Sequence, residues 1–286
     1  MTTLLVGTAV QAGKKRAWDQ APRWQIHLPL ALYLLFTLVP FYWILLFALR
    51  PAGSTSLVPW PVTFEHFAKV WTERSFATYF QNSVLIGIVT LVLTTLVALA
   101  GGYALARFDF RAKQGFMLAL LCSQFVPGAL LLVPLFQIFA ELRMINSLGS
   151  VILAETVFQL PLSMILISGF IKNVPYALEE AAWVDGCGRM RAFRVVVLPL
   201  LRPGLVAVGS FAFVHAWNHF LFALMFLSNQ EKQTIPVGLN TLMGADSVDL
   251  GALAAGGVIA AVPVVIVFAY IQKWLITGFS AGAVKG

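Results

Sequence analysis

The feature that most constrains this chain is a series of six long apolar runs that carry almost no charge. They cover residues 28–49, 84–106, 115–140, 151–171, 204–227 and 254–275. A helix needs about 20 apolar residues to cross a bilayer, and only helices and closed barrels satisfy their backbone groups there. Charged residues make up 11% of the sequence, whereas an ordinary soluble domain has about 25%. We therefore expect an all-α membrane protein with six transmembrane helices.

The first run does not fit a cleaved secretory signal. It is longer than the apolar core of about 7–15 residues found in signal peptides, and it ends at Arg50 rather than at small residues. We expect an uncleaved helix there, with a basic cytoplasmic leader over residues 1–27 and a single membrane domain over residues 28–286. A short surface helix is predicted between Phe64 and Phe80.

Basic residues indicate the orientation of the predicted spans. Six spans place both termini on one side, together with the 107–113 turn and the 172–203 loop. That side carries fourteen Lys and Arg residues and the other side five, at positions 50, 69, 74, 143 and 232. Because basic segments are retained in the cytoplasm, we expect both termini and the 172–203 loop to be cytoplasmic. The net charge of +7 then reflects orientation against anionic lipid, not nucleic-acid binding.

Nucleotide hydrolysis by this chain is not expected. The segment GTAVQAGKK at 7–15 differs from a phosphate-binding loop, since five residues separate its glycines and no Ser or Thr follows Lys14. Cys122 and Cys187 lack the spacing of a disulfide framework or metal site, so we expect free thiols.

The densest charge lies between Pro175 and Pro203. Pro175 suits the first turn of a helix, and Gly186 suits its end. These signals predict a helix of about three turns, a glycine turn, and a second short helix that begins after Gly188 and ends at Pro199.

The predicted first helix has the properties of a docking element. Ala181 and Ala182 are small enough for it to enter a groove on another protein, and Glu180 and Asp185 would fix its register. The alternative is a solvated helix in which Glu and Ala simply favour the helical state.

The order of residues in this loop resembles the EAA signature of importer-type ABC permeases: Glu180-Ala181-Ala182, Gly186, Val196 and Leu198-Pro199. The fuller pattern is similar to carbohydrate permeases of the family that includes the maltose transporter's inner-membrane subunits. Supporting similarities are Asn82-Ser83, residues 103–108 and 126–136, Trp217-Asn218, Phe220-Leu221 and the terminal GFSAGAVKG. The resemblance covers about residues 28–286, with Cys187 standing where alanine is usual.

The resemblance implies a non-catalytic permease subunit of an ATP-driven carbohydrate importer in a bacterial or archaeal cytoplasmic membrane. It implies a second permease subunit, two ATP-binding subunits that hold ATP and Mg²⁺, an extracytoplasmic binding protein and a carbohydrate substrate. This chain would bind no cofactor. The residues expected to couple to the ATPase are Glu180, Ala181, Ala182, Asp185, Gly186 and Pro199.

Polar residues within the spans are candidates for the substrate path. Glu155 and Gln159 share one helix face and would either contact sugar hydroxyls or bond helix to helix. His215, Asn218 and His219 form a stripe beside Trp217. For this stripe we favour hydrogen bonding across a permease interface, then path lining with Trp217 as a stacking face. Metal binding is a weaker alternative, because two histidines lack thiolate or carboxylate neighbours in sequence. Gln124 is a further candidate.

Two other classes fit the residues alone. One is an ion-driven transporter with Glu155, His215 and His219 as proton carriers, and the other is a membrane enzyme that uses the two histidines. Uptake that stops on ATP depletion would favour the importer. The sequence leaves open which carbohydrate is carried, and whether the permease partner is a second copy or a different chain.

Overall fold

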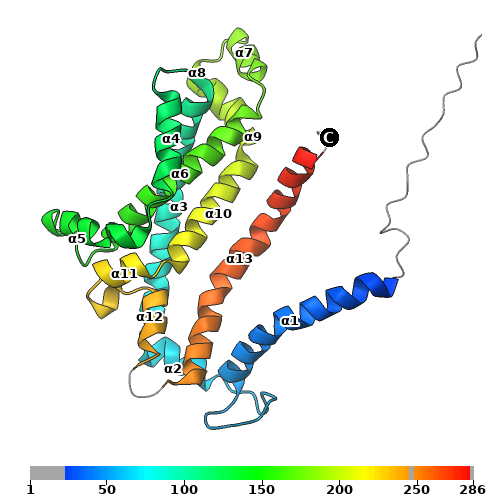
Figure 1. Ribbon diagram of the computed structural model, residues 1–286, viewed down its shortest axis with the longest axis vertical. Helices are drawn as coiled ribbons and strands as arrows, with labels where there is room; N and C mark the ends of the chain where they lie inside the picture. Colours follow the sequence, from blue (N-terminus) through cyan, green and yellow to red (C-terminus); the bar gives the residue numbers. More distant parts are fainter. Residues whose placement is uncertain (1–22, 245–247, 284–286) are drawn as a thin grey trace, which may run out of the picture.

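A computed structural model describes residues 23–244 and 248–283, and within them the regular structure is helical with no strands (Figure 1). Five long helices dominate: α1 (Arg23–Leu49), α3 (Phe76–Arg107), α6 (Leu148–Lys172), α10 (Arg202–Asn218) and α13 (Leu250–Ala283). Most of the predicted leader and the end of the tail lie outside the described residues. The all-helical prediction is confirmed.

Four described helices are long and apolar enough to cross a membrane, and two bent helix pairs raise the possible number to six. The four are the segments 24–49, 76–107, 148–172 and 250–273. They contain the first, second and fourth predicted runs and most of the sixth. The third and fifth runs are not single straight helices.

The third run is broken at Pro127. It consists of α4 (Lys113–Ser123), followed by the 3-10 turn η2 (Gly128–Leu131) and α5 (Leu132–Glu141), with a bend of 94° between the two parts. Pro127 is extended, with φ −61° and ψ 126°, and it cannot donate the amide hydrogen bond that would continue α4. Pro134 lies in the first turn of α5, where no helical hydrogen bond is lost.

The fifth run is broken in its C-terminal half, at His219. His219 is extended, with φ −76° and ψ 119°, so α10 stops at Asn218 and α11 (Leu221–Phe226) begins a new direction. The chain enters α10 through a further helical segment, Arg189–Leu200, which meets it at 74°. That segment comprises α8 (Arg189–Ala192), the π-helical turn η3 (Phe193–Val197) and α9 (Leu198–Leu200).

The centre of the molecule is α3 packed against α6 and α10. Small residues allow the close approach: a Cβ added at Gly102 would lie 2.7 Å from Ile167, and one at Gly87 would lie 2.7 Å from Phe213. Helix pairs in membranes commonly use such residues because lipid supplies no hydrophobic force between helices.

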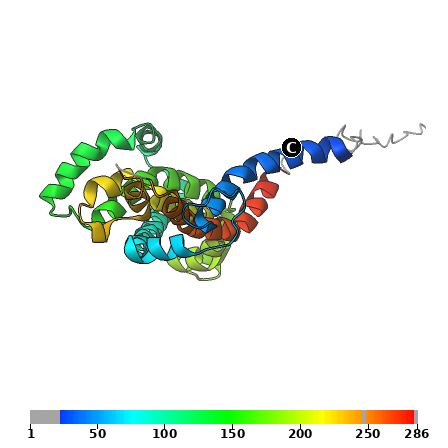
Figure 2. The same ribbon diagram turned by 90° about the horizontal axis from the view of Figure 1, so that it is seen from below.

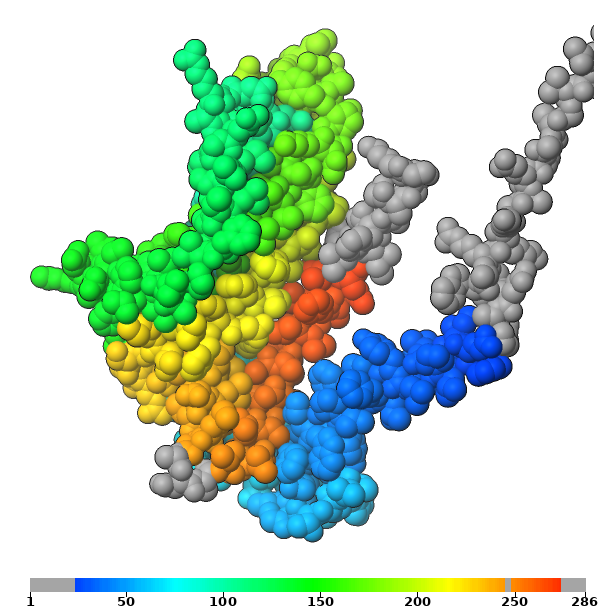
Figure 3. Space-filling view, in the orientation of Figure 1, coloured from blue at the N-terminus to red at the C-terminus, as the bar shows by residue number. Residues whose placement is uncertain are grey.

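Helix α1 stands away from this bundle (Figures 1 and 2). It meets the rest only near its C-terminal end, beside α2 (Glu65–Glu73) and α13, as the space-filling view shows (Figure 3). Leu46 and Ala48 are buried there, whereas residues 24–45 are exposed. An apolar surface of this kind suits contact with lipid or with another membrane protein.

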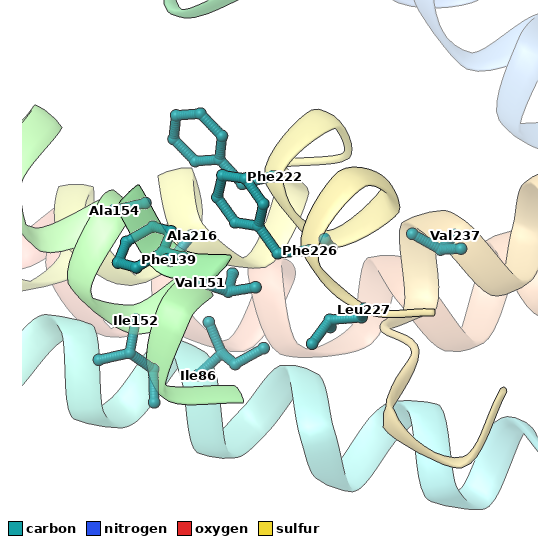
Figure 4. Packing of buried hydrophobic residues seen from close by; sticks show 11 residues of the cluster. Ile86, Phe139, Val151, Ile152, Ala154, Ala216, Phe222, Phe226, Leu227 and Val237 are labelled. Atoms are coloured by element: carbon teal, nitrogen blue, oxygen red, sulfur yellow. The ribbon is translucent and has the colours of Figure 1, made fainter. Parts of the chain in front are cut away.

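Three apolar clusters hold the described elements together. The first lies where α5 and α11 meet α6 and α3; its Phe222 and Phe226 rings stack with centroids 5.6 Å apart (Figure 4). The second surrounds Trp217, between α10 and α13, and includes residues of α12 (Ile235–Thr241). The third joins Ile167 and Ile171 of α6 to Val197 and Leu201, and so fixes the segment before α10 to the bundle.

Candidate functional site

The loop between α6 and α10 projects from one end of the bundle, beyond the C-terminal ends of α3 and α6 (Figure 1). Its first helix, α7 (Ala177–Val184), has 8 residues and is therefore shorter than the three turns expected. Gly186 has φ +83°, the left-handed conformation that lets glycine end a helix. The second helical segment, Arg189–Leu200, continues past Pro199, where the sequence predicted its end. Pro199 fits because it lies in the first turn of α9.

A buried carboxylate fastens α7 to α3. The Glu179 side chain is 1% exposed. Its Oε1 accepts a 2.6 Å hydrogen bond from Arg107 Nε, and its Oε2 accepts a 2.7 Å bond from the Tyr103 hydroxyl. Arg107 Nη2 also donates to the Val174 carbonyl at 2.9 Å. Both carboxylate oxygens and two of the three guanidinium nitrogens therefore have hydrogen-bond partners, which help to stabilise a buried charge pair.

The two faces of α7 differ sharply. Tyr176, Glu179 and Trp183 follow the helical spacing of one face, and the Tyr176 and Trp183 rings meet edge to face at 5.7 Å. On the opposite face, Ala181 and Asp185 are exposed and Val184 is 88% exposed. The inward face therefore attaches the helix to α3, and the outward face is free to contact another molecule.

The predicted coupling residues lie mainly on this accessible side. Glu180, Gly186 and Pro199 are exposed, and Ala182 is half-buried. Within the described part of the chain neither Glu180 nor Asp185 forms an ion pair. Both carboxylates are therefore available to an external partner.

The sequence reasoning missed Tyr103, Arg107 and Glu179 as a site. A signal was present, because Tyr103 and Arg107 are four residues apart on α3 and Glu179 shares a face of α7 with two aromatic residues. That pattern shows that each helix has a distinctive face. It does not show that the two faces meet.

A second polar cluster joins α6 to α10. Glu155 is 0% exposed, and its Oε2 lies 3.1 Å from His215 Nδ1 in a hydrogen bond. Its Oε1 lies 2.6 Å from His219 Nδ1, a contact that becomes an ion pair when the imidazole is protonated. The two imidazole rings stack with centroids 5.4 Å apart. The structure thus brings Glu155, His215 and His219 together within one chain, beside the break between α10 and α11.

The other predicted path residues lie elsewhere. Trp217 is buried, donates from Nε1 to the Ala260 carbonyl at 3.0 Å, and stacks on Phe213, so no ring face is open to a sugar. Asn218 is exposed and bonds to the Val214 carbonyl, and Gln124 is exposed and bonds to the Phe158 carbonyl. Gln159 is buried, and its amide atoms lack partners among the described residues. Among all the residues that the structure describes, no three metal-ligating side chains are grouped so that they could hold a metal ion.

The chain is similar in sequence to inner-membrane subunits of transport systems. The family described as "Binding-protein-dependent transport system inner membrane component" matches residues 98–280. The chain is 36% identical over 252 residues to the diacetylchitobiose uptake system permease protein DasC of Streptomyces coelicolor. That alignment covers 86% of this chain and 91% of the relative. It is 33% identical over 280 residues to the arabinooligosaccharides transport system permease protein AraQ of Halalkalibacterium halodurans, covering 95% of this chain and all of the relative.

A solved structure supports the fold. The structure of a bacterial ABC transporter that imports the acidic polysaccharide alginate aligns with a TM-score of 0.73 at 19% identity. The alignment covers 88% of this chain and 98% of the solved chain. A second solved structure, of a bacterial alginate ABC transporter with a pentasaccharide-bound periplasmic protein, aligns with a TM-score of 0.68.

Proposed function

The chain belongs to the family of inner-membrane components of binding-protein-dependent transport systems. We propose that its α6–α10 loop couples a carbohydrate path through the membrane to a separate ATPase. Its relatives are permease subunits of sugar uptake systems. The chain is therefore a non-catalytic ABC permease subunit for sugar uptake. Membership of this family excludes the alternative that the chain is a membrane enzyme. It also favours an ATP-driven importer over the ion-driven transporter considered from the sequence.

The observation that carries the coupling proposal is the contrast between the two faces of α7. A partner that pulls on the exposed residues Ala181, Val184 and Asp185 would transmit force through Glu179 to Arg107 at the end of α3. Because α3 packs along α6 and α10, movement of the loop would reach the centre of the bundle. Rigid-body motion of packed helices is a common way to alternate access across a membrane.

The proposed assembly contains this chain, a second permease subunit, two ATP-binding subunits that hold ATP and Mg²⁺, and an extracytoplasmic binding protein. Its support is the family description, which names dependence on a binding protein, and the alginate transporter solved with its periplasmic protein. The proposed location is the bacterial cytoplasmic membrane, with the α6–α10 loop on the side that contains ATP.

For the substrate we propose an oligosaccharide. The two relatives described above are named for the uptake of diacetylchitobiose and of arabino-oligosaccharides. Of the polar residues near the breaks in the spans, His215, Asn218 and Gln124 have accessible side chains. These three are the proposed path residues, whereas Glu155 holds the α6–α10 contact and Trp217 holds the α10–α13 contact.

The coupling proposal is tested by Glu180→Lys, with Glu231→Lys as the matched control. Both carboxylates are exposed, but Glu231 lies in η4 (Gln230–Lys232), at the other end of the bundle. Reversing the charge at an interface weakens association by placing like or unpaired charges together. In transporter reconstituted with its ATPase, we expect Glu180→Lys to lower ATPase co-purification and sugar uptake at least tenfold, while Glu231→Lys leaves both unchanged. Unaltered association and uptake in Glu180→Lys would refute the docking surface.

A further inference from the structure

A pocket of about 400 Å³ lies behind α7, between its inward face and the last turns of α3. Its apolar wall is formed by Leu96, Leu99, Ala100, Met190 and Phe193. Its polar residues are Tyr103, Arg107, Trp183 and Arg189. The pocket is separate from the outward face of α7, which carries the proposed ATPase contact.

The polar end of the pocket has two unused hydrogen-bond donors. Trp183 Nε1 is buried and has no acceptor within the described chain. The Arg189 guanidinium lies 5.5 Å from the Trp183 ring centroid and pairs with no described carboxylate. Arg107, in contrast, is already neutralised by Glu179. A buried donor without a partner is unfavourable, so this end is suited to a ligand with anionic oxygen atoms.

The apolar end continues along a membrane helix. Leu96, Ala100, Tyr103 and Arg107 are three or four residues apart, so they share one face of α3. Leu96 is 59% exposed and lies within a segment able to cross the membrane. A ligand in this pocket would therefore extend from Trp183 Nε1 and the Arg189 guanidinium, near the C-terminal end of α3, to an apolar surface that faces lipid.

We propose that this pocket binds an anionic phospholipid. Its phosphate oxygens accept from Trp183 Nε1 and Arg189, and one acyl chain lies along Leu96, Ala100 and Met190. The match of a negative headgroup with Arg189 and of an acyl chain with the apolar wall favours lipid over a soluble anion, which leaves the apolar wall uncovered. Basic residues near the ends of membrane helices commonly bind anionic headgroups.

The ligand would also support the coupling loop, because the pocket walls belong both to α3 and to the segment from Tyr176 to Phe193. The site does not depend on the proposed docking face. If Glu180→Lys fails to affect ATPase binding, lipid binding here would still be expected. The two proposals can therefore fail separately.

The test uses the full chain in its assembled transporter, with quenching of Trp183 fluorescence by brominated phosphatidylglycerol. Subtracting the signal of Trp183→Phe isolates this tryptophan from the others. We expect brominated phosphatidylglycerol to quench Trp183 at lower mole fraction than brominated phosphatidylcholine. Arg189→Gln should weaken the phosphatidylglycerol effect by about tenfold, as expected for loss of a charged hydrogen bond. Arg194→Gln is the matched control, since Arg194 is exposed on the same segment but does not line the pocket.

Three outcomes would overturn the proposal. They are equal quenching by the two lipids, an unchanged response in Arg189→Gln, and displacement of phosphatidylglycerol by millimolar inorganic phosphate, which would indicate a soluble anion. Ala100→Phe adds a steric test by filling the apolar end, and it should abolish quenching. If that variant does not fold, Arg189→Gln still decides the question, because it alters only an exposed side chain.

Discussion

Adjacent carboxylates on α7 have opposite environments. Glu179 is buried against Arg107 and Tyr103, whereas Glu180 is exposed. Both are acidic residues in the first turn, where the helix dipole favours them equally. The difference arises from a rotation of about 100° per residue around the helix axis, which turns one side chain toward α3 and the other toward solvent.

A double-mutant cycle tests the buried pair. Glu179→Gln leaves the Arg107 guanidinium, with a side chain 9% exposed, without its counter-charge, and removing one partner of a buried pair costs about 3–5 kcal/mol. We expect a large fall in the thermal unfolding temperature of the purified permease for Glu179→Gln and for Arg107→Gln. The double variant should lose much less than the sum, because neither buried charge remains.

Glu180→Gln is the control for this cycle, and its stability should match the wild type. Additive losses in the double variant would show that Glu179 and Arg107 act independently. A stability loss in Glu180→Gln equal to that of Glu179→Gln would contradict the assignment of the two faces of α7.

Among the elements, hydropathy predicted the straight helices well and the bent ones poorly. The runs at 84–106 and 151–171 lie within α3 and α6. The run at 115–140 has the composition of one span but bends by 94°, because apolarity reports how a segment is solvated and not its direction. Pro127 was the local sign of that break. The break at His219 had no such sign, and it coincides with the His219–Glu155 contact to another helix.

The candidate site also has features that the sequence indicates and contacts that it does not. For the outward residues of α7, the order along the chain carries the resemblance from which their coupling role is inferred, and that role stays a prediction. The Glu179 attachment and the Glu155 cluster join residues 72 and 60 positions apart in sequence. Such contacts depend on how α3, α6, α7 and α10 pack, and periodicity within each helix does not determine them.

Close packing of α3 on α6 leads to a prediction for Gly102. An added Cβ would lie 2.7 Å from Ile167 and 3.1 Å from the Met164 carbonyl oxygen, and forcing extra volume into a packed contact costs about 1–3 kcal/mol. We expect Gly102→Ala to lower the thermal unfolding temperature in detergent.

Gly169→Ala supplies the comparison, because Gly169 is also within a long helix but an added Cβ meets nothing within 4 Å. Alanine should stabilise this position by about 0.5–1 kcal/mol through its better helix propensity. Equal effects of the two substitutions would show that α3 and α6 are not tightly packed at Gly102.

At the scale of the whole molecule, the polar elements gather at two opposite ends. The α6–α10 loop lies at one end, and α2 and the N-terminal end of α13 lie at the other (Figure 1). Eight of the fourteen basic residues predicted for the cytoplasmic side belong to the 107–113 turn and the 172–203 loop. Arg189, Arg191 and Arg194 are exposed in that loop. Since basic segments remain in the cytoplasm, we expect the α6–α10 loop to face the cytoplasm. Labelling from one side of the membrane can test this orientation.

Cysteine labelling tests that orientation in a background where the two free cysteines, Cys122 and Cys187, are replaced by alanine. Arg191→Cys and Glu231→Cys each place one thiol at an exposed position at opposite ends of the bundle. A maleimide that cannot cross membranes should label Glu231→Cys in cells with an intact cytoplasmic membrane, and both variants after detergent permeabilisation. Protection of Arg191→Cys before permeabilisation is the essential result, because the ATPase can act on the α6–α10 loop only from the cytoplasm. Labelling of Arg191→Cys but not of Glu231→Cys in intact cells would reverse the topology and remove the coupling proposal with it.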